Sequence, residues 1–161
     1  SHLGGLIFSE MTGTQSTHIP YKGSAQSVLD VAAGRVQFLF TSISTTQALH
    51  RDGKLRIIAV AGPKQSVIPD VPSMAEAGFP EYSLYFWFAT FMPAGTPGEI
   101  VARMNRDTNA TVLDAKTSKS LVDAGVTPEV LSPQELATLI KKDAETFRQV
   151  VIKAGIKPQP I

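Results

Sequence analysis

The run from Leu55 to Val60 constrains the fold of this chain more than any other feature. It is apolar at every position except Arg56. A strand with one face in water alternates apolar and polar residues, whereas a continuous apolar run is typical of a strand covered on both faces. Such strands belong to parallel sheets with helices packed on both sides. The run therefore predicts an α/β protein.

The segments around this run support that prediction. Strand-like and helix-like segments alternate over about the first 82 residues, and glycines separate them. Further strands are expected at residues 17–20, 36–40, 83–92 and 127–131, and helices at residues 3–11, at residues 24–33 and in the stretch that ends at Gly53. Alternation of this kind implies a parallel sheet with right-handed crossovers. The aromatic residues 85–88 are expected to be buried on both faces of their strand.

The chain becomes mostly helical after about residue 93. A cap residue, a first-turn proline and a carboxylate occur together at residues 96–99 and again at residues 132–135, which predicts two helix starts. Thr96 and Ser132 are the expected caps. Helices are expected at residues 97–113, 116–124 and 133–154.

Balanced charge and the lack of cysteine exclude several classes of protein. The chain carries 15 lysines and arginines against 14 aspartates and glutamates, with no block of like charge. A binder of nucleic acid or of a membrane surface typically has a clustered basic face, so neither partner is expected. No apolar segment reaches the ~18 residues of a membrane span. The absence of cysteine excludes disulfides and thiol nucleophiles and is compatible with the periplasm.

Motifs for catalysis or cofactor binding are absent from the sequence. It contains no glycine-rich phosphate loop and no nucleophile elbow. The histidines His2, His18 and His50 lie on different predicted elements without metal-ligand spacing. We therefore expect no catalytic residue, no metal, no cofactor and no enzymatic activity.

Hydroxyl-rich turns before the predicted helices are the candidate binding sites. In parallel α/β sheets, ligands bind beyond the carboxyl ends of the strands, where helix N-termini offer unpaired N–H groups and a positive dipole end. Small neutral turns at that place suit a carboxylate, because they hold the anion without chemistry and release it quickly. The candidate ligand-binding residues are Ser1, His2, Tyr21, Lys22, Gly23, Ser24, Thr41 and Ser42.

Each candidate also has a purely structural interpretation, which the sequence leaves open. Serines and threonines at helix starts are ordinary caps. Lys22 is typical of a solvated surface lysine and His2 of a residue with local hydrogen bonds, while Tyr21 fits packing and binding equally. Trp87 is typical of a core residue, although an aromatic at a lobe junction can also line a cleft.

Several longer motifs resemble one receptor family, in its order and spacing, across nearly the whole chain. The motifs are HIPYKGSA at 18–25, GRVQFLF at 34–40, GKLR at 53–56, IPDVPSMAEAG at 68–78, PAGTP at 93–97 and AGIKP at 154–158. Together they resemble the Bug family, the substrate-binding receptors of tripartite tricarboxylate transporters.

The resemblance implies a fold and a function. The fold would be a periplasmic-binding-protein-like (type II) lobe with a parallel-rich sheet, plus the helical C-terminal part of the other lobe. Residues 1–86 would form the second, inserted lobe without its first strand, and residues 87–161 the crossover strand and the C-terminal portion of the first lobe. The function would be that of a periplasmic solute receptor, which binds a small organic carboxylate for uptake or sensing and passes it to membrane permease subunits.

The resemblance also implies that the chain is N-terminally truncated and carries about half of a binding cleft. We therefore expect exposed apolar faces, relieved by dimerisation, strand exchange or partial disorder. Two residues depart from the family pattern. Thr41 stands where many members carry aspartate, which would remove a negative charge from the pocket. Leu6 stands where members often carry glutamate, which is expected to affect packing.

A second class of protein shares this general architecture: the ligand-sensing domain of a LysR-like transcription regulator. The Pro-Tyr-Lys-Gly and Pro-Ala-Gly-Thr-Pro motifs favour the receptor. The upstream gene sequence separates the two hypotheses, since a regulator would encode a helix-turn-helix there and a receptor a signal peptide.

Overall fold

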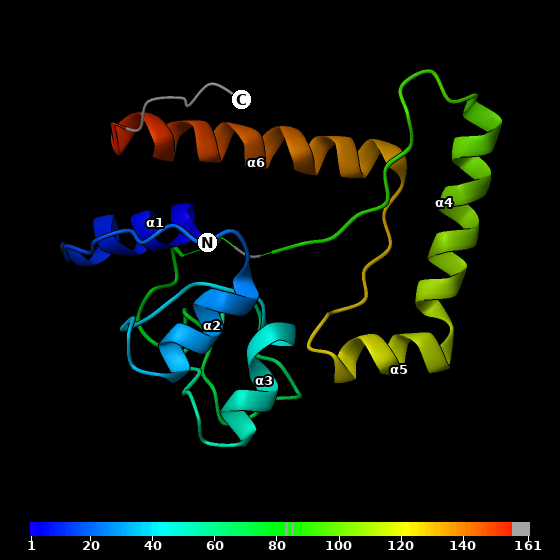
Figure 1. The fold of residues 1–161 in the computed structure, drawn as a ribbon. Helices are drawn as coiled ribbons and strands as arrows, with labels where there is room; N and C mark the ends of the chain where they lie inside the picture. Colours follow the sequence, from blue (N-terminus) through cyan, green and yellow to red (C-terminus); the bar gives the residue numbers. More distant parts are fainter. Residues whose placement is uncertain (83, 85, 156–161) are drawn as a thin grey trace.

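The computed structural model describes residues 1–82, 84 and 86–155, and its regular elements within them are helices (Figure 1). The helices are α1 (His2–Thr12), α2 (Ser24–Ala32), α3 (Ile43–Arg51), α4 (Gly98–Leu113), α5 (Ala115–Asp123) and α6 (Pro133–Lys153). Each lies where the sequence predicts a helix. The helical predictions are therefore confirmed, with shifts at some ends.

Two helix ends follow the predicted chemistry. Helix α1 ends at Gly13, whose φ of 65° is the left-handed conformation that glycine adopts without strain. Helix α6 begins with a complete capping box at Ser132. The hydroxyl of Ser132 accepts from the N–H of Glu135 at 3.2 Å, and the Glu135 carboxylate accepts from the N–H of Ser132 at 2.7 Å. These hydrogen bonds hold the pKa of Glu135 below its usual value.

Two other helix starts differ from the prediction. The cap of α4 is Pro97, and the hydroxyl of Thr96 instead donates to the carbonyl of Pro93 at 2.8 Å. The cap of α5 is Asp114, whose carboxylate accepts from the N–H groups of Lys116 and Thr117 at 3.1 and 3.0 Å. The sequence contained that signal, because an aspartate before a helix is a strong N-cap.

The predicted strands form no sheet within the described residues. The one β-bridge among those residues is parallel and joins Val60, at the end of a predicted strand, to Ser73, which lies in no predicted strand. In it, Val60 donates to the carbonyl of Pro72 at 2.9 Å and accepts from the N–H of Met74 at 2.8 Å. A parallel strand obtains its hydrogen bonds from strands distant in sequence. Residues 127–131 bond instead to side chains, since Asn105 donates to the carbonyl of Leu131 at 2.8 Å.

The core is small and lies in the first half of the chain. Val60, Ile68 and Val71 form its buried cluster, against which Ile43 and Ile57 pack. No described residue of α4, α5 or α6 is buried. This agrees with the expectation of exposed apolar faces.

The expectation that the aromatic segment is buried on both faces is wrong for its described residues. Phe86 is 51% exposed and Phe88 is 76% exposed, while Trp87 is half-buried. Tyr85 lies outside the described residues. Among the described residues, no helix or sheet packs on both faces of this segment, so Phe86 and Phe88 stay exposed.

Three pairs of helices make the most extensive contacts among the described residues: α2 with α3, α4 with α5, and α1 with α6. The first pair and the core cluster form one end of the molecule, and α4 and α5 extend away from it (Figure 1). Helix α6 returns across the molecule and lies alongside α1 (Figure 1). The last helix of the chain therefore contacts the first.

Candidate ligand-binding site

The segments that lead into α2 and α3 both contact the start of α1. The ring of His2 stacks on that of His18, just before Tyr21, with centroids 3.8 Å apart. Phe40, the residue before Thr41, lies against Gly4 and Gly5 in the first turns of α1. The structure thus brings His18 and Phe40, which adjoin the second and third predicted turns, to the start of α1.

Gly4 permits the close approach on which this region depends. A Cβ at this position would lie 3.0 Å from the hydroxyl of Tyr82 and 3.4 Å from the Cβ of Phe40. Tyr82 is buried and donates to the carbonyl of Gly4 at 3.2 Å. Burial raises the pKa of Tyr82 to about 12, so its hydroxyl remains a donor at neutral pH. The Gly4-Gly5 pair inside a predicted helix was the available sequence signal, because glycine disfavours a helix interior.

In the second turn, Tyr21 has a partner within the protein. Its hydroxyl donates to Asp30 of α2 at 2.9 Å, and Asp30 also pairs with Arg35 at 2.7 Å. The hydrogen bond from Tyr21 and then that from Arg35 lower the pKa of Asp30. This geometry matches the packing alternative for Tyr21. Lys22 and Ser24 are exposed, and Gly23 rather than Ser24 is the N-cap of α2.

The third turn is a cluster of hydroxyl groups. Ser42 is the N-cap of α3, and its hydroxyl accepts from that of Ser44 at 3.0 Å. The hydroxyls of Thr41 and Thr45 lie 3.3 Å apart, and Thr45 also donates to the Ser42 carbonyl at 2.8 Å. Thr45 was not among the predicted site residues. The sequence could have indicated it, because Thr45 belongs to the hydroxyl-rich run of residues 41–46.

The other half of the chain reaches the same region. Gly125, after α5, lies so close to Ile43 that a Cβ on it would meet the Ile43 side chain at 2.6 Å. Beside this contact, the side-chain amide of Gln47 donates to the carbonyl of Asp123 at 3.1 Å. The start of α3 is therefore flanked by both parts of the chain.

The N-termini of α1, α2 and α3 share an electrostatic property. Within the described residues, no side chain caps them by hydrogen bonding and no acidic residue occupies their first turns. The other helices each have a carboxylate at this end: Glu99 in α4, Asp114 before α5 and Glu135 in α6. The first three helices therefore present N–H groups and a positive dipole end without a built-in anion.

The pKa of His2 lies below its usual value. Partial burial is the main cause, followed by the charges of His18 and of the terminal amino group. In the part of the chain that the structure describes, no group of three potential metal ligands occurs. Nor is any described helix long and apolar enough to cross a membrane.

Comparison with known proteins decides the family. A family described as "Tripartite tricarboxylate transporter family receptor" matches residues 1–156. The chain belongs to this receptor family. Protein BugT of Bordetella pertussis is 33% identical over 162 residues, which cover 98% of this chain and 48% of BugT. The predicted resemblance to Bug receptors is thereby confirmed.

Solved structures of similar proteins have the same fold. Rpa4515 of R. palustris, solved with adipate, matches with a TM-score of 0.89 and 33% identity over 98% of this chain and 53% of that one. MatC of Rhodopseudomonas palustris, solved with bound malate, matches with a TM-score of 0.82 and 26% identity over 94% and 53%. The periplasmic binding protein BugD also matches, with a TM-score of 0.79 and 27% identity over 99% of this chain and 54% of that one, so the periplasmic-binding-protein fold class is confirmed. The chain spans about half the length of these relatives, and the comparisons give no support to a LysR-like regulator.

Proposed function

We propose that this receptor binds a small organic carboxylate in the periplasm, for uptake or sensing. The observation that carries the proposal is the contrast between the helix N-termini. Those of α1, α2 and α3 lack a carboxylate, whereas α4, α5 and α6 each supply their own. The segments that lead into α2 and α3 also contact the start of α1. A bound carboxylate would take the place that Asp114 takes at α5.

The binding groups are backbone N–H groups and neutral hydroxyls. Ser42 and Thr41 stand at the start of α3, Gly23 and Ser24 at the start of α2, and Ser1 and His2 at the start of α1. Charge-assisted hydrogen bonds from such donors to a carboxylate are stronger than bonds between neutral groups. No covalent step is involved, so we infer a receptor without catalytic activity, cofactor or metal.

The site lies between two proposed lobes, residues 1–86 and residues 87–161. The contact of Gly125 with Ile43 supports this, because it places the second range beside the start of α3. Ligand binding would close the lobes by a hinge motion at the crossover segment, residues 87–92, where the second range begins. The complete protein would then deliver the ligand to permease subunits of its transporter.

The proposed chemistry of the ligand rests on the relatives and on Thr41. Adipate and malate, the ligands of Rpa4515 and MatC, are both dicarboxylates. The neutral Thr41 adds no negative charge to the site, which favours a ligand with more than one carboxylate. We therefore propose a dicarboxylate or tricarboxylate ahead of other organic acids.

Isothermal titration calorimetry of the full-length protein tests the proposal, with malate, adipate, citrate and benzoate and with the diamide of malate as a neutral control. Binding of one or more acids, without binding of the diamide, is expected. The substitution Ser42→Asp places a carboxylate at the start of α3, so binding should weaken about tenfold or more. Aspartate is a good N-cap, so the helix itself should remain stable.

The matched control is Ser132→Asp, which makes the same change at the start of α6. Its affinity for the acids should equal that of the unmodified protein. The proposal fails if no acid binds, or if Ser42→Asp binds as tightly as Ser132→Asp.

A further inference from the structure

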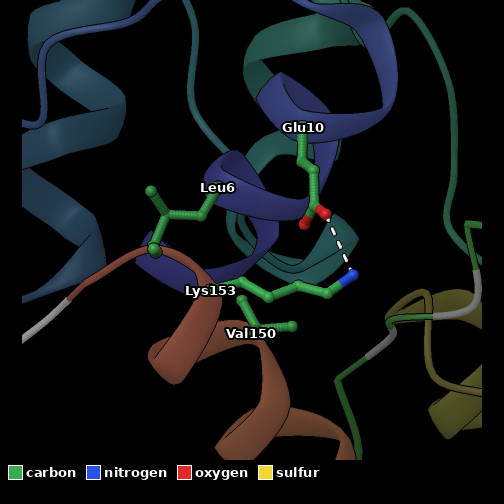
Figure 2. Close-up of a pocket in the computed structure, with 5 residues that line it drawn as sticks. Leu6, Glu10, Val150 and Lys153 are labelled. Atoms are coloured by element: carbon green, nitrogen blue, oxygen red, sulfur yellow. Dashed lines mark hydrogen bonds and ion pairs between the residues drawn. The ribbon is translucent and has the colours of Figure 1, made fainter.

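The C-terminal end of α6 contacts α1. Leu6 and Glu10 of α1 and Val150, Lys153 and Ala154 of α6 line an open depression between the helices (Figure 2). Lys153 extends from the last turn of α6 toward Glu10, and its amino group lies 3.1 Å from the carboxylate (Figure 2). An ion pair thus joins two contacting helices that are far apart in sequence, beside a depression lined partly by apolar side chains.

A second contact fixes the middle of α6 against the crossover segment. The indole N–H of Trp87 donates to the carboxylate of Asp143 at 2.7 Å. Asp143, Val150 and Ala154 lie at spacings of seven and four residues, which places them on one face of the helix. One face of α6 therefore lies against the crossover segment in the middle of the helix and beside α1 near its C-terminal end.

We propose that the Glu10–Lys153 ion pair forms a clasp between the two lobes, which stabilises their ligand-bound arrangement. The proposal rests on the proposed function, because it assigns α1 to the lobe of residues 1–86 and α6 to the other. The clasp lies outside the candidate binding site and acts on affinity through lobe position. Glu10 and Lys153 are thus positioning residues.

The likeness to Rpa4515 connects this arrangement with bound ligand. That structure contains adipate and matches 98% of this chain with a TM-score of 0.89. A match of that quality over the whole chain requires both proposed lobes to be placed alike in the two proteins. The two proposed lobes therefore lie in this chain as they do in a protein solved with a dicarboxylate.

Loss of the clasp should reduce the population that binds ligand, and the apparent affinity falls by the same factor. The side chains of Lys153 and Glu10 are 65% and 53% exposed, so solvent screens their attraction. Glu10→Lys replaces the attraction between Glu10 and Lys153 by a repulsion between two lysines. This about doubles the change in interaction energy relative to removal of the charge alone. We expect an apparent Kd roughly threefold to tenfold higher for Glu10→Lys at low salt, and a smaller change at high salt.

The experiment uses the full-length protein with Glu10→Lys, Lys153→Glu and both together. Calorimetry with malate and adipate measures affinity, and small-angle X-ray scattering without ligand measures how open the lobes are. Each single variant should bind more weakly and show a larger radius of gyration. The double variant restores the opposite charges, so both quantities should return toward their original values.

Glu145→Lys is the matched control, because Glu145 forms an ion pair of similar exposure with Arg148 inside α6. Glu145→Lys changes the net charge by the same amount as Glu10→Lys. The ion pair that it removes lies within α6 and joins no second helix. Its affinity and radius should be unchanged. The general attraction of added positive charge for an anion would strengthen binding, so weaker binding by Glu10→Lys cannot come from net charge.

Two outcomes overturn the clasp: single variants that match the control in radius of gyration, or a double variant that remains as open as the single ones. Failure of the unmodified protein to bind any acid would instead overturn the proposed function. The scattering measurement needs no ligand, so it tests the clasp in that case as well.

Discussion

Gly4 shows how one residue without a side chain positions the candidate site. The hydroxyl of Tyr82 and the side chain of Phe40 occupy the space beside it. Neither neighbour yields easily, because the Tyr82 hydroxyl is buried and bonded to the Gly4 carbonyl. The start of α1 is thereby held against the segment that leads into α3.

Replacement of Gly4 by alanine should therefore destabilise the protein. Alanine favours a helix over glycine by about 1 kcal/mol, but the shift of Tyr82 would cost one buried hydrogen bond, about 1–3 kcal/mol. A net loss of roughly 1 kcal/mol is expected in urea unfolding followed by circular dichroism.

The neighbouring glycine is the control. A Cβ at Gly5 would have its nearest neighbour at an ordinary 3.8 Å, in the ring of Phe40. Gly5→Ala should leave stability unchanged or raise it by about 0.5–1 kcal/mol. Equal destabilisation by both substitutions would show that the contact at Gly4 has no special importance.

At the scale of elements, the helices could be predicted because their signals are local. Glycine endings and the capping box at Ser132 depend on residues within one turn. The strands could be predicted only as apolar segments, because their pairing depends on residues distant in sequence. For the same reason, the sequence identified the three candidate turns but could not show that Phe40 and His18 bring them to α1.

The caps themselves provide a test at this scale. Ser132→Ala removes a hydroxyl that accepts from the N–H of Glu135, so it should cost about 1 kcal/mol of unfolding free energy. Ser42 caps α3 without such a bond. Ser42→Ala should therefore change stability by less than about 0.5 kcal/mol in the same urea titration. A comparable loss in both variants would contradict the description of α3 as a helix without a side-chain capping hydrogen bond.

At the scale of the whole molecule, the chain exposes more apolar surface than a soluble monomer normally does. Phe88 is 76%, Phe91 is 65% and Ile58 is 70% exposed. The chain spans about half the length of BugT and of Rpa4515, whose further residues offer more structure to cover such side chains. The resemblance to longer receptors predicted from sequence that apolar side chains would be exposed. Which side chains are exposed could be learned only from the structure.

The isolated chain should self-associate through these aromatics. Size-exclusion chromatography with light scattering is expected to show dimers or larger species, and Phe88→Asp should shift them toward the monomer. Leu29→Asp, at a residue 61% exposed on α2, is the control and should leave association unchanged. A wild-type chain that stays monomeric at high concentration would refute this prediction.

A crystal structure of the full-length protein with a bound dicarboxylate tests the central claim most directly. The account predicts one ligand carboxylate within hydrogen-bonding distance of the N–H groups that begin α1, α2 or α3, beside the hydroxyls of Thr41 and Ser42. A dicarboxylate bound elsewhere, with all three helix starts in contact with solvent alone, would contradict it.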